Sequence, residues 1–506
     1  MHENLDNVDK ISEYDVCIVG SGPAGLAVAS KLISEGIKFI ILESGEVNPN
    51  MQHRELNEGH SKGPRKLDLV NSRLRCLGGA GKLWAGVCRP FDPEEFNVGN
   101  SSYGGWPINY SDVDEYYKEA AAILGLSYEK FFTKDWRTDA SLAVNFSSFA
   151  GTKGILRGVQ YQRSSVINRD LSNLYQDALF KDKNCTVLTN ATLSDIVQSK
   201  KNVVEHVVVK SFSGKEVVVR AKTFVLCTGA IENPRILLDS SLKPEIKNNK
   251  FIGACFMSHP AFRGAATLTK NGIDKCEDVG GSLGWDFGFE MTASERSRSN
   301  SLRHNISIKP IRTAKTNMKE ASTYAVVKNN IQVLMSYSNK VRCKLLGGRL
   351  DSKHWGLDIA VEQEPRLSNY IKLSKDKDRH GKSKVEIFWD SMSVREMKTV
   401  LEAAKAVGRE SMLTDVGICR ISETLESKAI FKQDDAINHH IGTTRMAESP
   451  EYGVVDSNLK MFGLSNLYIS GSSVFPTSSI VNPTYSIIAL SLRLGNHIVN
   501  QAKLAG

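Results

Sequence analysis

Two adjacent histidines near the C-terminal end of the chain are the residues best suited to acid–base chemistry. They lie in the segment NHHIGTTRM, residues 438–446, with a Gly-Thr-Thr turn close behind them. A neutral imidazole, with an ordinary pKa of about 6.5, is a competent proton acceptor near pH 7. On an extended segment, adjacent side chains point to opposite faces, so His439 and His440 cannot both reach one reacting group. From the residues alone, a packed ring is the commoner role for either histidine.

A glycine-rich turn near the N-terminus has the spacing of a dinucleotide-binding fingerprint, Gly-x-Gly-x-x-Gly. Its glycines are Gly20, Gly22 and Gly25. An apolar run at residues 16–19 precedes the turn, a stretch with helical periodicity follows it, and a second apolar run at 39–42 ends at Glu43. This order predicts a strand, a helix and a second strand, with a diphosphate at the helix N-terminus and the ribose hydroxyls on the Glu43 carboxylate. The unit by itself fits FAD and NAD equally.

Further glycines surround a tryptophan in RLRCLGGAGKLWAGVCRPFDPEEF, residues 73–96. This composition fits a backbone pressed against a flat or charged ligand, and it fits a surface loop equally well. Gly79 and Trp84 are the candidate binding residues of the segment.

Two later segments have the pattern of strands that end at a ligand. CTGAIENPRILLDSS passes from the end of a strand into a helix, and NLYISG is a buried strand followed by two serines. Ligands of α/β proteins bind at the carboxyl ends of such strands. We therefore expect Gly229, Ala230, Gly471 and Ser472 to return to the nucleotide site.

The remaining pattern predicts an α/β fold with more than one domain, since 506 residues exceed the size of most single cores. Short β-branched runs between residues 184 and 226 predict a small antiparallel sheet. A later region combines strand-like pieces with helical stretches near 315–345 and 392–412, which predicts an inserted sheet-plus-helices substrate domain. A Rossmann-like, discontinuous nucleotide-binding domain surrounds it. The expected boundaries are 1–254 with 447–506 for the nucleotide domain, and 255–446 for the substrate domain.

Composition and charge indicate an ordinary globular protein, with 41% hydrophobic and 24% charged residues. The formal charge of +9 is spread over 65 basic and 56 acidic residues without a block of like charges, so a nucleic-acid interface is not indicated. The nine cysteines include no CxxC pair, which indicates reduced thiols rather than disulfides or a metal site. Signal-peptide regions and long apolar runs are missing, so we expect a cytoplasmic location and no membrane span.

Taken in order, these motifs resemble those of the glucose-methanol-choline (GMC) oxidoreductases, which are FAD-dependent. The resemblance covers nearly the whole chain: the N-terminal fingerprint, GGAGKLWAG with CRPFDPEEF, GWPINYSDVDEYY, CTGAIENPRILL, CFMSHP, and the C-terminal His-x-x-Gly-Thr and Asn-Pro blocks. Within the family, HHIGTTRM and NPTYSIIAL are most similar to pyranose-oxidase-like enzymes and to bacterial dehydrogenases of sugar or aminosugar alcohols.

The resemblance implies roles for individual residues. The spacing to the Gly-Thr pair assigns His439 the position that faces the flavin and Asn482 the position of its partner. Asn482 also precedes Pro483, and this order is typical of a helix start, so helix capping is the alternative role. His259 in MSHP matches another family position and is interpreted as structural. Members that tether their flavin do so through a histidine in the glycine-tryptophan stretch, which GGAGKLWAG lacks, so non-covalent FAD is expected.

The activity that the resemblance implies is oxidation of a CH–OH group in a sugar, glycoside, aminosugar or related natural-product intermediate. His439 would take the hydroxyl proton as hydride leaves carbon for flavin N5, and Asn482 would donate a hydrogen bond to the substrate oxygen. O2, a quinone or another carrier would accept the electrons. The alternative is an FAD-containing lyase or decarboxylase of the same fold. The C-terminal block disfavours a third hypothesis, a non-catalytic or NAD-dependent nucleotide-binding protein.

Overall fold

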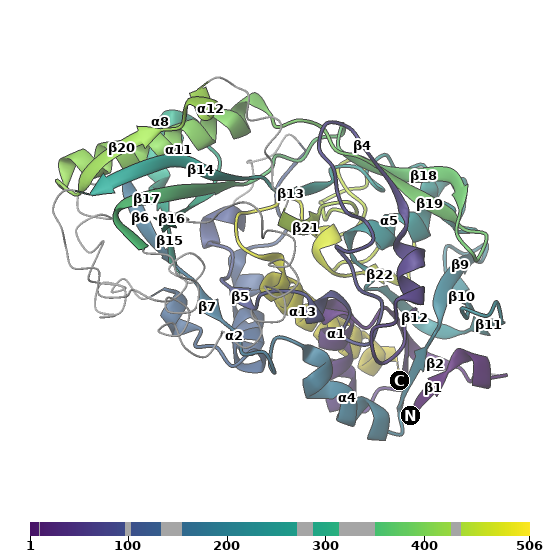
Figure 1. Ribbon diagram of the computed structural model, residues 1–506. Coiled ribbons are helices and arrows are strands. Elements are labelled where there is room, and N and C mark those ends of the chain that lie inside the picture. The colour runs from purple at the N-terminus through teal and green to yellow at the C-terminus, as the bar shows by residue number, and fades with distance from the viewer. Residues whose placement is uncertain are drawn as a thin grey trace, which may run out of the picture.

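A six-stranded parallel sheet organises the N- and C-terminal parts of the chain in the computed structural model (Figure 1). The structure describes residues 1–9, 11–96, 103–132, 154–270, 287–312, 350–426 and 437–505. The strand order is β1-β8-β3-β2-β12-β22, and every neighbouring pair is parallel. The strands are β1 (His2–Asn4), β2 (Tyr14–Val19), β3 (Phe39–Leu42), β8 (Cys185–Thr189), β12 (Ala221–Leu226) and β22 (Leu467–Ile469).

Helices cover one face of the parallel sheet, and a small antiparallel sheet covers the other (Figure 1). The covering helices are α1 (Pro23–Ser34), α4 (Leu171–Lys181) and α13 (Pro483–Ala505), with α2 (Asp114–Ile123) against α13. The succession β2, α1, β3 confirms the strand–helix–strand unit expected from the N-terminal fingerprint. β2 reads YDVCIV, a nearly continuous apolar run, because a central parallel strand is buried on both faces.

The antiparallel sheet expected at residues 184–226 is only partly correct. Its true members are β9 (Thr192–Gln198), β10 (Val204–Lys210) and β11 (Glu216–Val219). The first and last apolar runs of the region are instead β8 and β12, which pair with β3 and β2 of the parallel sheet. The pairing partner of such a run depends on what buries its two faces, and local alternation does not encode that.

A second six-stranded sheet, at the upper left of Figure 1, has the order β20-β14-β17-β16-β15-β6. Its strands are β6 (Leu156–Gln160), β14 (Ala261–Lys270), β15 (Phe287–Met291), β16 (His304–Arg312), β17 (Leu350–Val361) and β20 (Gly417–Ile421). α11 (Val394–Leu413) packs on it and begins with a capping box between Ser393 and Glu396. This helix confirms the helical stretch expected near 392–412, whereas the one expected near 315–345 lies outside the described residues.

The smaller elements connect the two large sheets. β18 (Tyr370–Lys377), β19 (Ser383–Phe388) and β4 (Gly59–Lys62) form a three-stranded sheet. β13 (Met257–His259) pairs antiparallel with β21 (Ile437–Ile441). The other short elements are β5 (Val87–Cys88), β7 (Gln162–Arg163), α5 (Gly229–Asp239), α6 (Pro244–Lys247), α8 (Ala293–Ser299) and α12 (Glu423–Glu426).

The chain passes between these layers several times. β4 and β6 come from the first 254 residues, yet β4 pairs with β19 and β6 pairs with β15. The fold class, a discontinuous Rossmann-like unit with an inserted sheet-plus-helices region, is confirmed by this architecture. The exact division at residues 254 and 446 stays a prediction.

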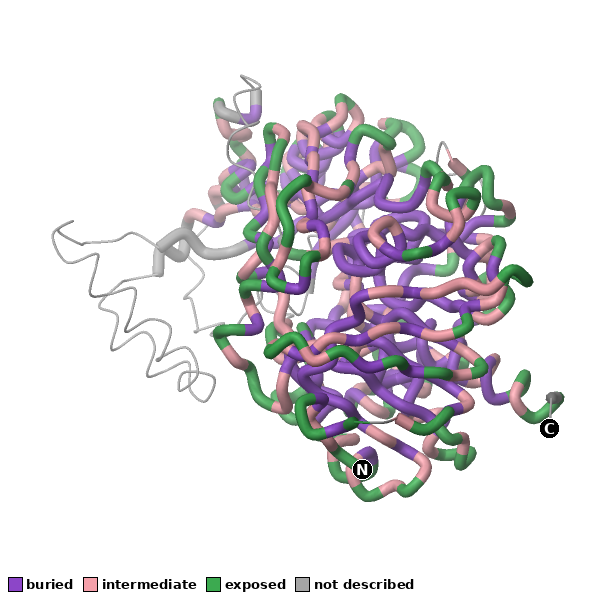
Figure 2. The backbone as a smooth tube through the Cα atoms, turned by 90° about the vertical axis from the view of Figure 1, so that its right-hand side faces the viewer, coloured by how far each residue is buried: buried purple, intermediate pink, exposed green. Residues whose placement is uncertain are grey.

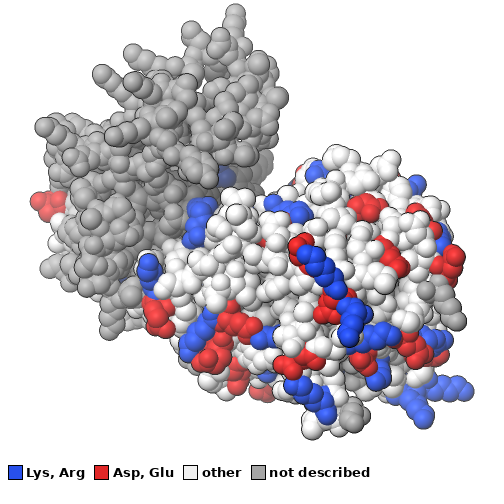
Figure 3. All heavy atoms as spheres, turned by 90° about the horizontal axis from the view of Figure 1, so that it is seen from below, with Lys and Arg blue, Asp and Glu red and all other residues white. Residues whose placement is uncertain are grey.

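Each layer has its own hydrophobic core. The largest cluster of buried apolar side chains surrounds the parallel sheet, a second lies under α11, and a third lies beneath β18 and β19. Figure 2 shows the buried segments running through the interior, with exposed residues at the periphery. On the face in Figure 3, basic and acidic side chains are interspersed rather than grouped by sign.

Gly25 sets how closely α1 approaches β2. A Cβ atom built at Gly25 lies 2.0 Å from the Gly20 carbonyl oxygen and 3.3 Å from Ile18 Cγ2. A backbone oxygen cannot swing aside as the end of a flexible side chain can. Only glycine therefore allows the first turn of α1 to sit directly against the turn that follows β2.

Replacing Gly25 with alanine should push α1 away from β2 and lower the free energy of unfolding by about 1–3 kcal/mol, the usual cost of overpacking. Thermal and urea unfolding of the purified variant measure this. Gly408→Ala in α11 is the matched control, because its added Cβ would lie 3.6 Å from Cys419 Cβ, an ordinary contact. That change should stabilise the helix by about 0.5–1 kcal/mol. A Gly25→Ala protein as stable as wild type would contradict the packing argument.

Candidate active site

A cavity of about 620 Å³ opens at the carboxyl ends of the parallel strands. The segments that follow β2, β3, β12 and β22 line it, together with β21 and the start of α13. These segments converge because neighbouring parallel strands end at the same edge of a sheet. Every residue predicted for the site except Gly25 lines this cavity: Gly20, Gly22, Glu43, Gly79, Trp84, Gly229, Ala230, Gly471, Ser472, His439 and Asn482. Its size is typical of small-molecule and cofactor sites, about 300–1,000 Å³.

Two glycine turns meet through their backbones on one wall of the cavity. Gly20 has a φ of +95°, and a Cβ atom on it would lie 2.8 Å from the Cys227 carbonyl oxygen. A Cβ atom on Gly79 would lie 3.1 Å from Gly22 Cα. The Cβ position of Gly22 meets nothing within 4 Å, so the space beside the start of α1 is open and its N–H groups are accessible to an anion. A diphosphate fits this cradle.

Glu43 ties the turn after β2 to the end of β3. One carboxylate oxygen accepts hydrogen bonds from the Ser21 N–H at 3.1 Å and the Ser21 hydroxyl at 2.5 Å. The other accepts from the Gly45 N–H at 2.9 Å. The Ser44 hydroxyl reaches this second oxygen only at 3.5 Å, so this is the acceptor position that a hydroxyl group of a ligand in the cavity can take. Ser21 is a site residue that the glycine pattern alone did not single out.

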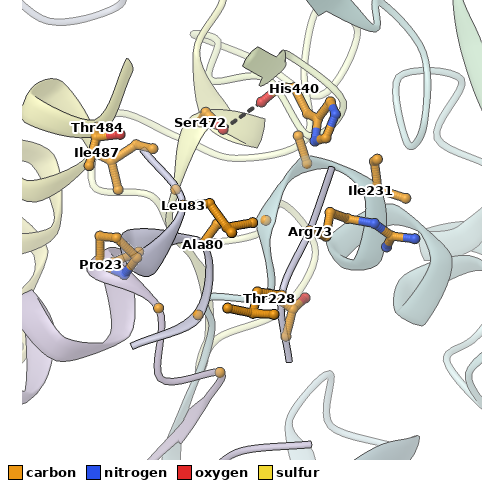
Figure 4. A pocket seen from close by; sticks show the side chains of 18 of the residues that line it. Pro23, Arg73, Ala80, Leu83, Thr228, Ile231, His440, Ser472, Thr484 and Ile487 are labelled. Atoms are coloured by element: carbon orange, nitrogen blue, oxygen red, sulfur yellow. Dashed lines mark hydrogen bonds between the residues drawn. The ribbon is translucent and has the colours of Figure 1, made fainter. Parts of the chain in front are cut away.

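Side chains of different character face each other across the cavity (Figure 4). One side carries Arg73, Ile231 and His440, the other carries Pro23, Thr484 and Ile487, and Leu83 lies between them. Leu83 is 51% exposed, which places an apolar side chain on the cavity surface. Its neighbour Trp84 donates its indole N–H to the Arg169 carbonyl oxygen at 2.8 Å, which fixes this loop.

An arginine cluster beside the cavity was missed by the sequence analysis. Arg73 Nη1 lies 2.6 Å from Glu232 Oε1, and Arg235 Nε lies 2.7 Å from Glu232 Oε2. Burial opposes the charge on Glu232, but Arg235, Arg75 and Arg73 together hold the pKa of this carboxyl below its usual range. The signal available in the sequence was the Arg-Leu-Arg triplet directly ahead of the glycine-tryptophan loop.

His439 lines the cavity from β21, and its ring contacts a second histidine. The Nδ1 atoms of His439 and His259 lie 2.9 Å apart, and the two rings meet edge to face. Burial lowers the pKa of His439 well below its ordinary value, and the neighbouring His259 and His440 lower it further. The ring is therefore neutral at pH 7.

His440 also contributes to the cavity wall, but its ring faces a different neighbour. The ring lies 6.1 Å from that of Phe256, and the His440 carbonyl accepts a hydrogen bond from the Ser472 hydroxyl at 2.6 Å. Burial, followed by the positive charge of Arg73, lowers the pKa of His440 to about 3. The two adjacent histidines thus diverge, as alternation along a strand requires.

Asn482 stands directly before α13 and lines the cavity. Its Nδ2 donates to the Val87 carbonyl oxygen at 2.9 Å. A primary amide has two N–H groups, so a second donor is left for a ligand. Among the described residues, this hydrogen bond to β5 is the contact that holds the side chain, rather than a bond to the first turn of the helix.

Family models match three stretches of the chain, and each stretch contributes residues to the wall of the cavity. The model of an FAD binding domain matches residues 13–53, which include the glycine turn and Glu43. The N- and C-terminal models of GMC oxidoreductases match residues 159–261 and 365–491, which carry α5, β21, β22 and Asn482. The chain belongs to the GMC oxidoreductase family.

The likeness extends over the full length of other proteins. The chain is 21% identical to the fructose dehydrogenase large subunit of Gluconobacter japonicus, over 97% of this chain and 98% of that protein. It is 23% identical to 2-methyl-1,2-propanediol dehydrogenase of Mycolicibacterium austroafricanum, over 96% of this chain and 95% of that protein. The crystal structure of formate oxidase shares the fold, with a TM-score of 0.60 at 15% identity over 99% of this chain and 100% of that one.

This GMC oxidoreductase is an FAD-dependent enzyme, and the cavity residues fit the cofactor: a glycine-lined helix start for the diphosphate, and a carboxylate directly after β3. Cys227 lines the cavity as a free thiol, and burial raises its pKa so that it stays protonated. In the described ranges, no three His, Cys, Asp or Glu side chains gather as a metal site would need. Within the same ranges, the helices are too short or too polar to span a membrane.

Replacing Glu43 with alanine should weaken FAD retention, because the change removes the ligand-facing carboxylate and releases Ser21 and Gly45. The ratio of flavin to protein absorbance after extended dialysis measures this. Glu46→Ala is the matched control, because Glu46 is bonded to Asn4 and does not line the cavity. If the Glu43 variant keeps as much FAD as the Glu46 variant, the assignment of Glu43 to the cofactor is wrong.

Proposed function

We propose that this GMC oxidoreductase oxidises a CH–OH group of a sugar, glycoside or aminosugar, with His439 as the base and non-covalently bound FAD as the oxidant. One observation carries the proposal: a neutral imidazole on the wall of the cavity where the strand ends of the FAD-binding fold converge. No other described histidine lines this cavity except His440, whose ring packs towards Phe256.

The lowered pKa of His439 suits a base that works at neutral pH. A base accepts a proton only in its unprotonated form, and burial keeps this ring unprotonated. The same shift lowers its affinity for the proton. That cost is tolerable when the proton moves in the same transition state as the hydride, because the alcohol becomes more acidic as the C–H bond breaks.

The proposed reaction balances as the loss of two hydrogens from the alcohol. The O–H bond breaks and its proton goes to Nε2 of His439, while the C–H bond breaks and the carbonyl forms. Bound FAD supplies the acceptor for the hydride, at its N5 atom. O2, a quinone or another carrier then removes the two electrons, and the proton on His439 passes to solvent.

We assign Asn482 the role of hydrogen-bond donor to the substrate oxygen. Its amide is held by Val87 through one N–H, which leaves the other to face the cavity. A fixed donor directed at an oxygen that gains negative charge lowers the barrier, because the donor need not reorganise during the reaction.

A polyhydroxylated substrate is supported by two relatives of the chain, one a fructose dehydrogenase and the other a dehydrogenase of a diol. We place substrate selection in residues 255–446, the region inserted between the two parts of the FAD-binding fold. The motifs that fit the cofactor lie mainly outside this region, in the FAD-binding parts.

His439→Ala should leave the protein folded and yellow and slow flavin reduction by substrate about 10²- to 10⁴-fold, the usual contribution of a general base. Anaerobic stopped-flow reduction with sugars, aminosugars and simple diols is the measurement, with flavin content and thermal melts recorded for each variant.

His440→Ala is the matched control, and it should slow reduction less than His439→Ala because its ring faces Phe256. Asn482→Ala should fall between the two, since it loses one donor to the substrate oxygen. A slower His440 variant would mean that the assignment is off by one residue. Full activity in both histidine variants would favour the lyase or decarboxylase alternative instead.

The pH dependence of flavin reduction provides a separate prediction. The rate is full above the pKa of the base and falls as the pH drops through it. Since burial lowers the pKa of His439 below the ordinary value of about 6.5, the rate should stay level from about pH 8 to pH 6.5 and decline only below that. A rate already halved at the ordinary histidine pKa would contradict this.

A further inference from the structure

His259 connects His439 to the loop that leads into α13. On one side, its Nδ1 lies 2.9 Å from His439 Nδ1. On the other side, its Nε2 lies 3.1 Å from the Ser478 carbonyl oxygen. The side chain is 1% exposed, so both ring nitrogens find their partners in the protein rather than in solvent.

The donor and acceptor chemistry of these groups assigns the protons. A carbonyl oxygen only accepts, so the contact with Ser478 requires a hydrogen on His259 Nε2. Burial lowers the pKa of His259 to about 4, so the ring is neutral at pH 7 and its Nδ1 carries a lone pair. The hydrogen between the two Nδ1 atoms must then belong to His439. A neutral His439 that is protonated at Nδ1 has its lone pair on Nε2.

We propose that His259 is a positioning residue that selects the tautomer in which His439 Nε2 is the proton acceptor. The inference rests on the proposed role of His439 as the base, and it explains why this ring offers a lone pair rather than an N–H to the substrate. Across the described part of the chain, the bond to His259 is the single hydrogen bond of the His439 ring, so Nε2 is left for a substrate.

The Ser478 carbonyl oxygen, which accepts the hydrogen bond from His259, belongs to a residue that is itself held in place. The Ser478 hydroxyl accepts a hydrogen bond from the Gln363 N–H at 2.9 Å, and both residues are buried. The same loop ends at Asn482, four residues further along the chain. One short loop therefore fixes the proton on His259 and also positions Asn482, the residue proposed to bind the substrate oxygen.

The tautomer can be measured without reference to activity. Nitrogen NMR of the FAD-loaded protein, labelled with ¹⁵N at histidine only, separates protonated from unprotonated ring nitrogens. Signals of His439 and His259 are assigned by their loss in His439→Ala and His259→Ala. We expect His439 protonated at Nδ1 and unprotonated at Nε2, and His259 protonated at Nε2. The reverse pattern on His439 would overturn the proposal.

Two substitutions at His259 separate its acceptor from its donor. In His259→Asn, the side-chain oxygen can take the place of Nδ1 and still accept from His439. In His259→Gln, the amide extends to the place of Nε2 and can donate to Ser478, but no acceptor remains beside His439. A catalytic histidine held in the wrong tautomer loses up to about 10⁴-fold in rate.

We therefore expect the kcat of His259→Gln to fall at least tenfold with little change in KM, and that of His259→Asn to fall by less than about tenfold. Equal losses in both variants, or a slower Asn variant, would mean that the ring acts only by packing, and would overturn the proposal. Rates are compared per bound flavin, so a loss of FAD does not enter the comparison.

The two proposals fail in different ways. If His439→Ala reduces its flavin at the wild-type rate while NMR finds the expected tautomer, His439 is not the base, and the inference about His259 loses its functional meaning. If His439→Ala is slow while NMR finds Nε2 of His439 protonated, the assignment of His439 as the base stands and the proposed role of His259 is wrong.

Discussion

The contact between two glycine turns at the carboxyl edge of the parallel sheet is the constraint on which the rest of the site depends. A Cβ atom on Gly79 would lie 3.1 Å from Gly22 Cα, and a Cβ atom on Gly20 would lie 2.8 Å from the Cys227 carbonyl oxygen. The start of α1 is consequently exposed to the cavity as bare backbone, which suits an anionic cofactor. Because Gly25 presses the same helix onto β2, the cradle has one position relative to the strand ends.

The carboxylates in this cavity are each bonded to hydrogen-bond donors or to side chains of opposite charge. Glu43 is bonded to backbone and hydroxyl donors, and Glu232 is paired with arginines. Among the described residues, no carboxylate is bonded to the His439 or His259 ring, and burial is the largest influence on the pKa of both, so both stay neutral. A carboxylate beside either ring would favour the imidazolium and remove the base. The carboxylates of the cavity are thus bonded to other groups, and the His439 imidazole is left neutral and able to accept a proton.

The bond from His259 to Ser478 also joins two layers of the protein. His259 ends β13, which runs directly into β14 of the larger antiparallel sheet, whereas Ser478 belongs to the loop before α13. A buried ionic cluster also connects the segment after β5 to the antiparallel sheet: Asp92 contacts Arg89 at 2.8 Å, and it also contacts Arg303, the residue directly before β16. Removing one partner from such a cluster typically costs about 3–5 kcal/mol.

The sequence by itself determined the features whose signal lies within a few residues. The Gly-x-Gly-x-x-Gly turn with Glu43 specified a strand–helix–strand unit, because this depends on local geometry, and the resemblance to the family motif His-x-x-Gly-Thr singled out His439. Only the tertiary structure decided that β8 and β12 join the parallel sheet. It also brought His259 to His439, 180 residues away along the chain. A buried histidine is equally compatible with simple packing, so its partner becomes known only when β13 pairs with β21.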